Sequence, residues 1–149
     1  AGDFVNDRKH GNGTLILSDA SSYNGGFRNG AFEGKGTLCE RDGTVYVGDW
    51  KSGSRHGEGM ETLSTGEVYK GSFRNGKREG QGTLLEKMGG KIVYSGQWRD
   101  GRYHGTGILM KRLVDPQSRE LFALRYEGEF ANGCKHGYGV LTTETTTCK

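Results

Sequence analysis

Four histidines share one recurring position in this 149-residue chain, and imidazole is the side chain most often used in general acid–base catalysis. Each stands directly before a Gly-x-Gly tripeptide, a position that Glu33 and Glu79 hold in two further copies. The histidines are His10, His56, His104 and His136. Catalytic groups must converge within hydrogen-bond reach, whereas equivalent positions of successive β-hairpins stand roughly 10 Å apart. We therefore expect these histidines to be structural, and we expect no catalytic residue and no enzyme.

A second group with chemical potential lies near the end of the sequence given. Cys134, His136 and Cys148 carry thiolate and imidazole groups, which zinc prefers as ligands. Three ligands would leave a fourth position open or shared with a second copy, and the alternative is two ordinary thiols. Zinc is the one cofactor that the sequence suggests. The odd total of three cysteines does not match a disulfide framework, so we expect a cytoplasmic protein.

Basic residues recur in the polar loops before the Gly-x-Gly tripeptides. A regular array would place them along one edge, where each could contribute up to ~1 kcal/mol to binding of anionic headgroups such as phosphoinositides. The candidate lipid-binding residues are Arg28, Arg55, Lys77, Arg78, Arg102 and Lys135. The alternative is a solvated rim, since acidic residues lie between them. The net charge of +3 is too small to indicate nucleic acid, which we do not expect as a partner.

These residues belong to a repeat of the form Tyr-x-Gly-x-aromatic, a polar loop, and then Gly-x-Gly. The first glycines of the motif, Gly2, Gly25, Gly48 and Gly71, follow one another every 23 residues, and Gly96 and Gly128 follow after 25 and 32. The aromatic pairs of the five complete copies are Tyr23 and Phe27, Tyr46 and Trp50, Tyr69 and Phe73, Tyr94 and Trp98, and Tyr126 and Phe130. A hydrophobic content of 32% is too low for one large core. Both observations indicate a repeat protein.

This pattern resembles the MORN (membrane occupation and recognition nexus) repeat, whose consensus runs roughly Tyr-x-Gly-x-Phe/Trp-x-Asn-Gly-x-x-x-Gly-x-Gly. The resemblance covers nearly the whole chain, and the first copy lacks its tyrosine, so we expect the C-terminal part of a longer array. Lipid binding is often ascribed to MORN proteins, and their arrays also accompany lipid kinase and methyltransferase domains. The resemblance thus implies either a membrane adaptor or the regulatory arm of an enzyme as alternatives to a protein-binding scaffold.

The local pattern predicts β-hairpins throughout. Tyr46, Gly48 and Trp50 share one face of a strand because side chains alternate, and Asn-Gly pairs such as Asn75-Gly76 favour tight hairpin turns. We predict an all-β fold, an elongated single-layer twisted antiparallel meander of about six hairpins and twelve strands. The array spans residues 1–149 as one domain. Its units are about 1–22, 23–45, 46–68, 69–93, 94–125 and 126–149, with a long hairpin insertion at 108–125.

A single-layer sheet has no second layer to cover its aromatic face, so we expect part of this face to form an accessible groove for a helix or an extended peptide. The predicted groove residues are Tyr46, Trp50, Tyr69, Phe73, Tyr94, Trp98, Tyr126 and Phe130. Phe122 and Leu124 of the insertion extend this face, and we expect a flap there that either contacts a partner or a second copy, or packs on itself.

The interpretation that follows is a non-catalytic scaffold that binds a protein partner, with a link to cytoskeletal or membrane-associated assemblies and with self-dimerisation as a further expectation. No apolar run approaches the ~20 residues of a membrane-spanning helix, so we expect no transmembrane segment.

Overall fold

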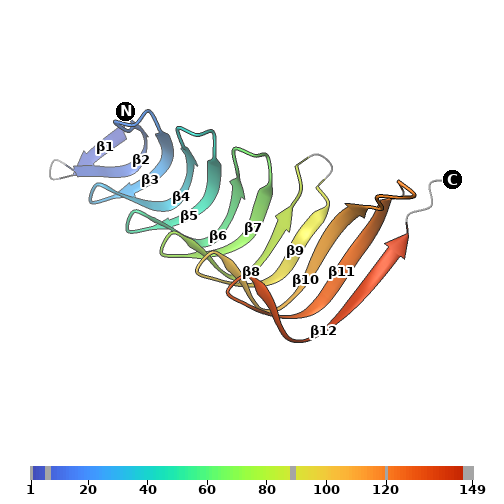
Figure 1. The fold of residues 1–149 in the computed structure, drawn as a ribbon. Coiled ribbons are helices and arrows are strands. Elements are labelled where there is room, and N and C mark those ends of the chain that lie inside the picture. The colour runs from blue at the N-terminus through green and yellow to red at the C-terminus, as the bar shows by residue number, and fades with distance from the viewer. Residues whose placement is uncertain (1, 6–7, 88–89, 120, 146–149) are drawn as a thin grey trace.

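The described residues form one open antiparallel sheet of twelve strands, in which each strand pairs with its neighbours in sequence (Figure 1). The computed structural model describes residues 2–5, 8–87, 90–119 and 121–145. The strands are β1 (Gly2–Val5), β2 (Arg8–Ile16), β3 (Ser22–Arg28), β4 (Ala31–Cys39), β5 (Val45–Lys51), β6 (Ser54–Thr62), β7 (Val68–Arg74), β8 (Lys77–Leu85), β9 (Ile92–Arg99), β10 (Arg102–Val114), β11 (Leu121–Ala131) and β12 (Cys134–Thr145). The predicted all-β meander is confirmed.

Two-residue turns join the strands of the five hairpins whose turns lie within the described residues. Asn75 and Gly76 adopt φ values of +50° and +82°, which is the left-handed pair that a type I′ turn requires. The turn of one hairpin also contacts the hairpin before it, because the amide of Gly76 donates to the carbonyl of Arg55. Equivalent bonds join Gly53 to Phe32 and Gly101 to Arg78. The hairpin ends therefore stack into a continuous edge.

Each hairpin bends toward its aromatic face. Tyr46 and Trp50 are four residues apart, a separation of about 13 Å along a straight strand, yet their ring centroids are 5.2 Å apart. On β6, three residues stand between the partners of Gly48 and Trp50, whereas β5 has one. Gly57, one of the extra residues, has a φ of +63° that favours glycine. Because this bulge bends the strands, the aromatic face is concave, and we call it the trough.

A row of glycines crosses the sheet where it bends. Each strand contributes one glycine, and each glycine lies opposite the next, as Gly48 does to Gly59 and Gly59 to Gly71. A Cβ on Gly59 would lie 2.5 Å from the Tyr46 hydroxyl and 2.6 Å from its ring. The prediction that glycines make room for the rings of neighbouring strands is confirmed.

The insertion forms the long hairpin of β10 and β11, as predicted. Its turn is closed by Asp115, whose carboxylate accepts hydrogen bonds from the amides of Gln117 and Ser118 at 2.7 and 2.8 Å. Leu113 pairs with Phe122 and Lys111 with Leu124, so this hairpin extends one wall of the trough.

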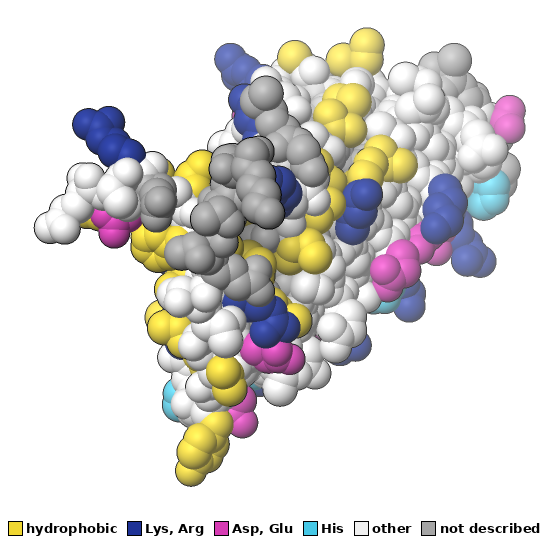
Figure 2. All heavy atoms as spheres, turned by 90° about the vertical axis from the view of Figure 1, so that its right-hand side faces the viewer, with side chains coloured by type: hydrophobic (Ala, Val, Ile, Leu, Met, Phe, Trp, Pro, Cys, Tyr) yellow, Lys and Arg dark blue, Asp and Glu magenta, His cyan; other side chains and the backbone are white. Residues whose placement is uncertain are grey.

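The last described strand, β12, has an outer edge that pairs with no strand among the described residues. Figure 2 looks at this end of the array and shows hydrophobic side chains gathered between Lys and Arg side chains. Tyr138, Val140 and Leu141 of β12 are 90%, 64% and 55% exposed. In the interior of the array, the equivalents of Leu141 pack in or against the core, as Leu38, Leu84 and Leu109 do.

Candidate functional site

The aromatic residues form the floor of the trough, and they are more buried than the sequence suggested. The eight predicted groove residues, Tyr46, Trp50, Tyr69, Phe73, Tyr94, Trp98, Tyr126 and Phe130, are only 0–8% exposed. The tyrosine of each hairpin packs edge-on against the aromatic residue of the next, as Tyr46 does against Phe73 at 4.9 Å. The expectation that part of this stripe stays accessible was wrong, because the bent sheet folds the rings against one another.

A second row of side chains covers rings of the floor, Phe27 in the first copy and the tyrosines in the others, and forms the accessible surface of the trough. We call these residues the cap row: Lys9, Phe32, Arg55, Arg78, Tyr103 and Lys135. Phe32 and Tyr103 stack on Tyr23 and Tyr94 with centroids 3.7 and 3.9 Å apart. The guanidinium groups of Arg55 and Arg78 lie 5.1 and 4.7 Å from the rings of Tyr46 and Tyr69. The surface of the trough therefore combines two aromatic caps with four cationic ones, and two of the cations, Arg55 and Arg78, are neighbours at its centre.

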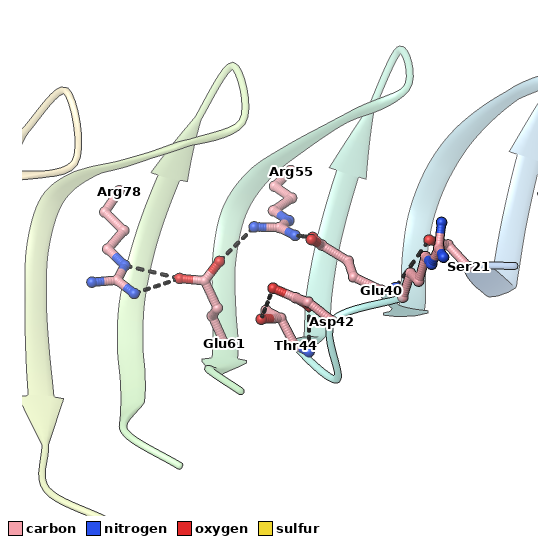
Figure 3. Close-up of polar contacts among 8 residues, drawn as sticks. Ser21, Glu40, Asp42, Thr44, Arg55, Glu61 and Arg78 are labelled. Carbon is pink, nitrogen blue, oxygen red and sulfur yellow. Dashed lines mark hydrogen bonds and ion pairs between the residues drawn. The ribbon is translucent and has the colours of Figure 1, made fainter. Parts of the chain in front are cut away.

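At the centre of the trough the two arginines belong to a chain of ion pairs (Figure 3). Arg55 donates through Nη1 to Glu61 Oε1 at 2.5 Å and through Nη2 to Glu40. Arg78 donates through Nε and Nη2 to Glu61 Oε2 at 2.9 and 2.6 Å. The side chains of Glu61, Arg55 and Arg78 are 9%, 15% and 16% exposed. Two cations and two carboxylates balance, so this central cluster has no net charge.

Glu61 differs from the residues at the same repeat position in the other hairpins. The corresponding position is leucine in the other hairpins, at Leu15, Leu38, Leu84, Leu109 and Leu141. Leu38 packs against the core and Leu84 is buried on the floor of the trough. Hence the polar centre of the trough is flanked on both sides by apolar surface.

Beside this centre the trough has a hollow of about 220 Å³. Leu84, Trp98 and Tyr103 supply apolar walls, and Arg78 and Arg102 stand at its border. An apolar side chain of moderate size fits such a hollow, and the two guanidinium groups can orient a neighbouring carbonyl or carboxylate.

Burial changes the acidity of the tyrosines in the floor. It raises the pKa of Tyr23, Tyr46 and Tyr94 to about 12, and it raises the pKa of Tyr69 as well. Each hydroxyl donates to a backbone carbonyl three residues further along its strand, as Tyr46 does to Asp49 at 2.9 Å. These phenols are thus neutral structural donors at neutral pH.

The predicted basic rim divides into two groups. Arg55 and Arg78 are strand residues inside the trough, and Lys135 lies 4.6 Å over the ring of Tyr126. The prediction that they line the outer edge was wrong for Arg55 and Arg78, because β6 and β8 begin before them. Arg28, Lys77 and Arg102 are exposed at hairpin ends, and Lys77 forms an ion pair with Asp100 at 2.9 Å.

The position that the four histidines hold contacts the next turn in the two copies that carry glutamate. In the two copies with glutamate, Glu33 accepts a hydrogen bond from the amide of Ser52 at 2.9 Å, and Glu79 accepts one from Asp100 at 3.0 Å. His10 and His104 have buried Nδ1 atoms without a hydrogen-bond partner in the described part of the protein. The four histidines stand one per hairpin along the array, on β2, β6, β10 and β12.

Of the predicted zinc ligands, Cys134 and His136 are exposed on β12, and Cys148 lies outside the described residues. Within the described residues no group of three or more histidine, cysteine, aspartate or glutamate side chains could hold a metal ion. The described part of the chain also contains no helix long and apolar enough to cross a membrane.

Sequence reasoning missed the cap row and the central cluster. The signal was present, since the cap row stands one residue before the histidine position in every copy. Aligning the copies also marks Glu61 as the one acidic residue in a leucine column. Neither pattern identifies contacts between hairpins unless the bend of the strands is known.

Comparison with known protein families agrees with the repeat. The family model described as the MORN repeat matches six segments, at residues 1–22, 23–45, 46–68, 69–90, 94–111 and 126–145. No curated protein matches the chain significantly.

Proposed function

The chain belongs to the MORN-repeat family, and from this premise we propose that it is a non-catalytic scaffold that binds a segment of a partner protein along its trough. MORN repeats generally serve as scaffolds in protein and membrane binding and are typically non-catalytic. The finer proposal concerns which surface binds and what it recognises.

The observation that carries this proposal is the composition of the accessible trough. Its centre is the neutral cluster of Arg55, Arg78, Glu61 and Glu40, and an apolar hollow lies beside it at Tyr103. Phe32 provides a second aromatic cap on the other side of the cluster. An exposed surface of this kind fits a segment with apolar side chains on both sides of a polar, uncharged centre.

The long hairpin adds to this surface. Phe122 and Leu124 are half-buried and point to the trough side of β11, in register with Leu113 and Lys111. We propose that the hairpin is a wall against which the bound segment lies. A partner in a cytoskeletal or membrane-associated assembly is the setting that we propose for the protein.

Substitutions that copy residues from other repeats test the trough without disturbing its floor. Phe32→Arg and Tyr103→Arg install the side chain that the same cap position carries at Arg55 and Arg78. We expect the double variant to fold and to lose at least about tenfold in captured partner, because removing apolar anchors from an interface costs 2 kcal/mol or more. The measurement is quantitative mass spectrometry of proteins captured from cells.

Val47→Thr is the matched control, since Val47 is exposed on the convex face and its strand partner Thr37 is already threonine. If the double variant, the control and the unchanged protein capture equal amounts of partner, the trough is not the binding surface.

A second candidate function is self-association through β12, which the exposed side chains of Tyr138, Val140 and Leu141 favour. An open strand edge with apolar side chains is a ready surface for pairing with another chain. Light scattering at high concentration tests this: a mass of twice the monomer supports it, and a monomer at every concentration rejects it.

A third candidate function is that of a membrane adaptor. Its binding site for anionic lipid would be Arg28, Lys77 and Arg102, the predicted basic residues that are exposed at hairpin ends. Pelleting with anionic vesicles at low and high salt is the test. Salt-sensitive binding that Arg28→Glu and Lys77→Glu abolish would support the lipid function over the trough.

A further inference from the structure

The two departures from the regular repeat meet at one place on the convex face. Gly71 and Gly96 are 25 residues apart and Gly96 and Gly128 are 32 apart, against 23 elsewhere. The first lengthens the connection from β8 to β9, and the second lengthens β10 and β11. Residues from both line a hollow of about 550 Å³, among them Lys91, Ile92, Met110, Lys111, Arg112 and Arg125. We call this hollow the wedge.

A break in strand pairing opens the wedge. Leu84 pairs with Tyr94 but Leu85 pairs with Ile92, so Val93 is an extra residue on β9 opposite β8. A bulge of this kind bends the strand and increases its local twist. The ladder between β9 and β10 ends at Tyr94 and Leu109.

Beyond that point β10 has an open edge. Residues 110–114 pair with β11 on one side and with no other strand among the described residues. Every second residue of an antiparallel strand directs its amide and carbonyl groups toward one neighbour, so this edge presents unpaired donors and acceptors. The wedge thus offers backbone hydrogen bonds as well as side chains.

The side chains of the wedge combine an apolar floor with a basic rim. Ile108 and Met110 lie on the convex face, because they alternate with Leu109, whose side chain packs against the core. Arg112 lies 4.0 Å from Glu86, and Arg125 pairs with Glu127 at 2.7 Å.

The other two cations of the rim have no such partner. Lys91 and Lys111 are exposed, and neither forms an ion pair with a described residue. Four cations stand around the wedge with one acidic side chain, Glu86, among its lining residues. The rim is therefore complementary to negative charge.

We propose that the wedge is a docking site for an acidic, extended segment of a partner protein, which adds as a short strand along residues 110–114 of β10. The added backbone satisfies the open edge, and its acidic side chains meet Lys91, Lys111 and Arg112. An apolar side chain of the segment lies over Ile108 and Met110. The floor of this site, Ile108 and Met110, lies on the face opposite the trough, and Lys111 stands on the trough side of the same open edge.

The open edge decides between a peptide and other anions. Lipid headgroups cannot supply the alternating donors and acceptors that an unpaired strand needs, whereas an extended peptide supplies both. Single-stranded nucleic acids bind largely by stacking of their bases on aromatic rings, and none of the described residues that line the wedge is aromatic.

Fluorescence polarisation with a labelled hexapeptide of five glutamates and one central valine, which presents carboxylates on both faces of the added strand, tests the proposal on the whole chain. We expect saturable binding, and we expect no binding of the matching lysine–valine peptide. Lys111→Glu combined with Arg112→Glu should weaken binding at least about tenfold, because both charge pairs become repulsive. Lys70→Glu, an exposed lysine elsewhere on the convex face, should change the affinity less than about twofold.

N-methylation of alternate peptide amides gives a second readout that does not alter the protein. In one of the two alternate patterns it removes the donors that face β10, so that pattern should abolish binding and the other should retain it. Circular dichroism confirms the fold of each variant, and Lys91→Gln serves if the double variant unfolds.

Three results overturn the proposal. They are absence of peptide binding, binding that is unaffected by both N-methylation patterns, and salt-sensitive binding to phosphatidylserine vesicles in place of the peptide. The third would assign the wedge to lipid.

Discussion

Glu61 and Arg78 lie 17 residues apart in the sequence, and two hydrogen bonds join them in the trough, from Nε and Nη2 of Arg78 to the same Oε2 of Glu61 at 2.9 and 2.6 Å. The other carboxylate oxygen of Glu61 accepts from Arg55. One buried carboxylate therefore holds two guanidinium groups from two neighbouring hairpins. It occupies a position at which every other hairpin has leucine.

Glu61→Leu restores the repeat pattern at this position, yet we expect it to destabilise the protein. The substitution leaves two arginines without their shared partner in a largely buried setting, and such a loss costs about 2–4 kcal/mol. The measurement is the free energy of unfolding in urea. An unchanged midpoint would show that the cluster contributes nothing to stability.

The triple variant Glu61→Leu, Arg55→Phe and Arg78→Tyr should recover the stability that the single variant loses. All three new side chains already occupy these positions in other hairpins, at Leu38, Phe32 and Tyr103. Replacing a whole buried ion network by packed apolar groups is often neutral or stabilising. A triple variant less stable than Glu61→Leu alone would contradict this account of the trough.

The strand order, the hairpin turns and the role of the glycines could be predicted from the sequence. They follow from the alternation of side chains along a strand and from the residue types that turns require. The sequence did not predict the positions of side chains that depend on the bend of the strands. Tyr46 and Trp50 were expected on an open face, but a bulge at Gly57 brings their rings together and buries them. The same bend carries Arg55 from the expected outer rim into the trough.

The wedge could not be predicted from the sequence either. The sequence marks both insertions as departures from the repeat, but it does not show that Lys91 and Arg112 approach the same hollow. Their positions around the hollow depend on the extra residue Val93 of β9 and on the point at which the pairing of β9 with β10 ends.

Gly59→Ala should destabilise the protein by about 2–3 kcal/mol, since its methyl group would lie 2.5 Å from the Tyr46 hydroxyl in a packed core. Gly76→Asn is the matched control, because no atom lies within 4 Å of a Cβ at Gly76 and asparagine tolerates its φ of +82°. We expect the control to change the free energy of unfolding by less than about 1 kcal/mol. Similar losses in both variants would mean that the glycine row does not make room for the rings.

The protein should lose stability as the pH rises above about 10. Tyrosine ionises near 10 in the unfolded chain, whereas burial raises the pKa of Tyr23, Tyr46 and Tyr94 to about 12 in the folded protein. Below about pH 10 the buried tyrosines contribute their full stabilisation. Between about pH 10 and 12 the unfolded chain releases protons that the folded protein retains, so this stabilisation is lost as the pH rises.

Urea unfolding at pH 8 to 12 measures this dependence. Tyr46→Phe should reduce the fall in stability with pH, because the variant has one phenol fewer to ionise on unfolding. The same pH dependence in Tyr46→Phe and in the unchanged protein would contradict the assignment.

Photocrosslinking from the cap row tests the central claim, that a partner protein lies in the trough, most directly. p-Benzoylphenylalanine replaces Tyr103 in one variant and Val47 of the convex face in another, and irradiation in cells traps whatever lies against each. We predict a discrete adduct of higher mass from position 103 that is lost when Phe32→Arg is added, and no such adduct from position 47. Adducts from position 47 alone would contradict the account, because they would place the partner outside the trough.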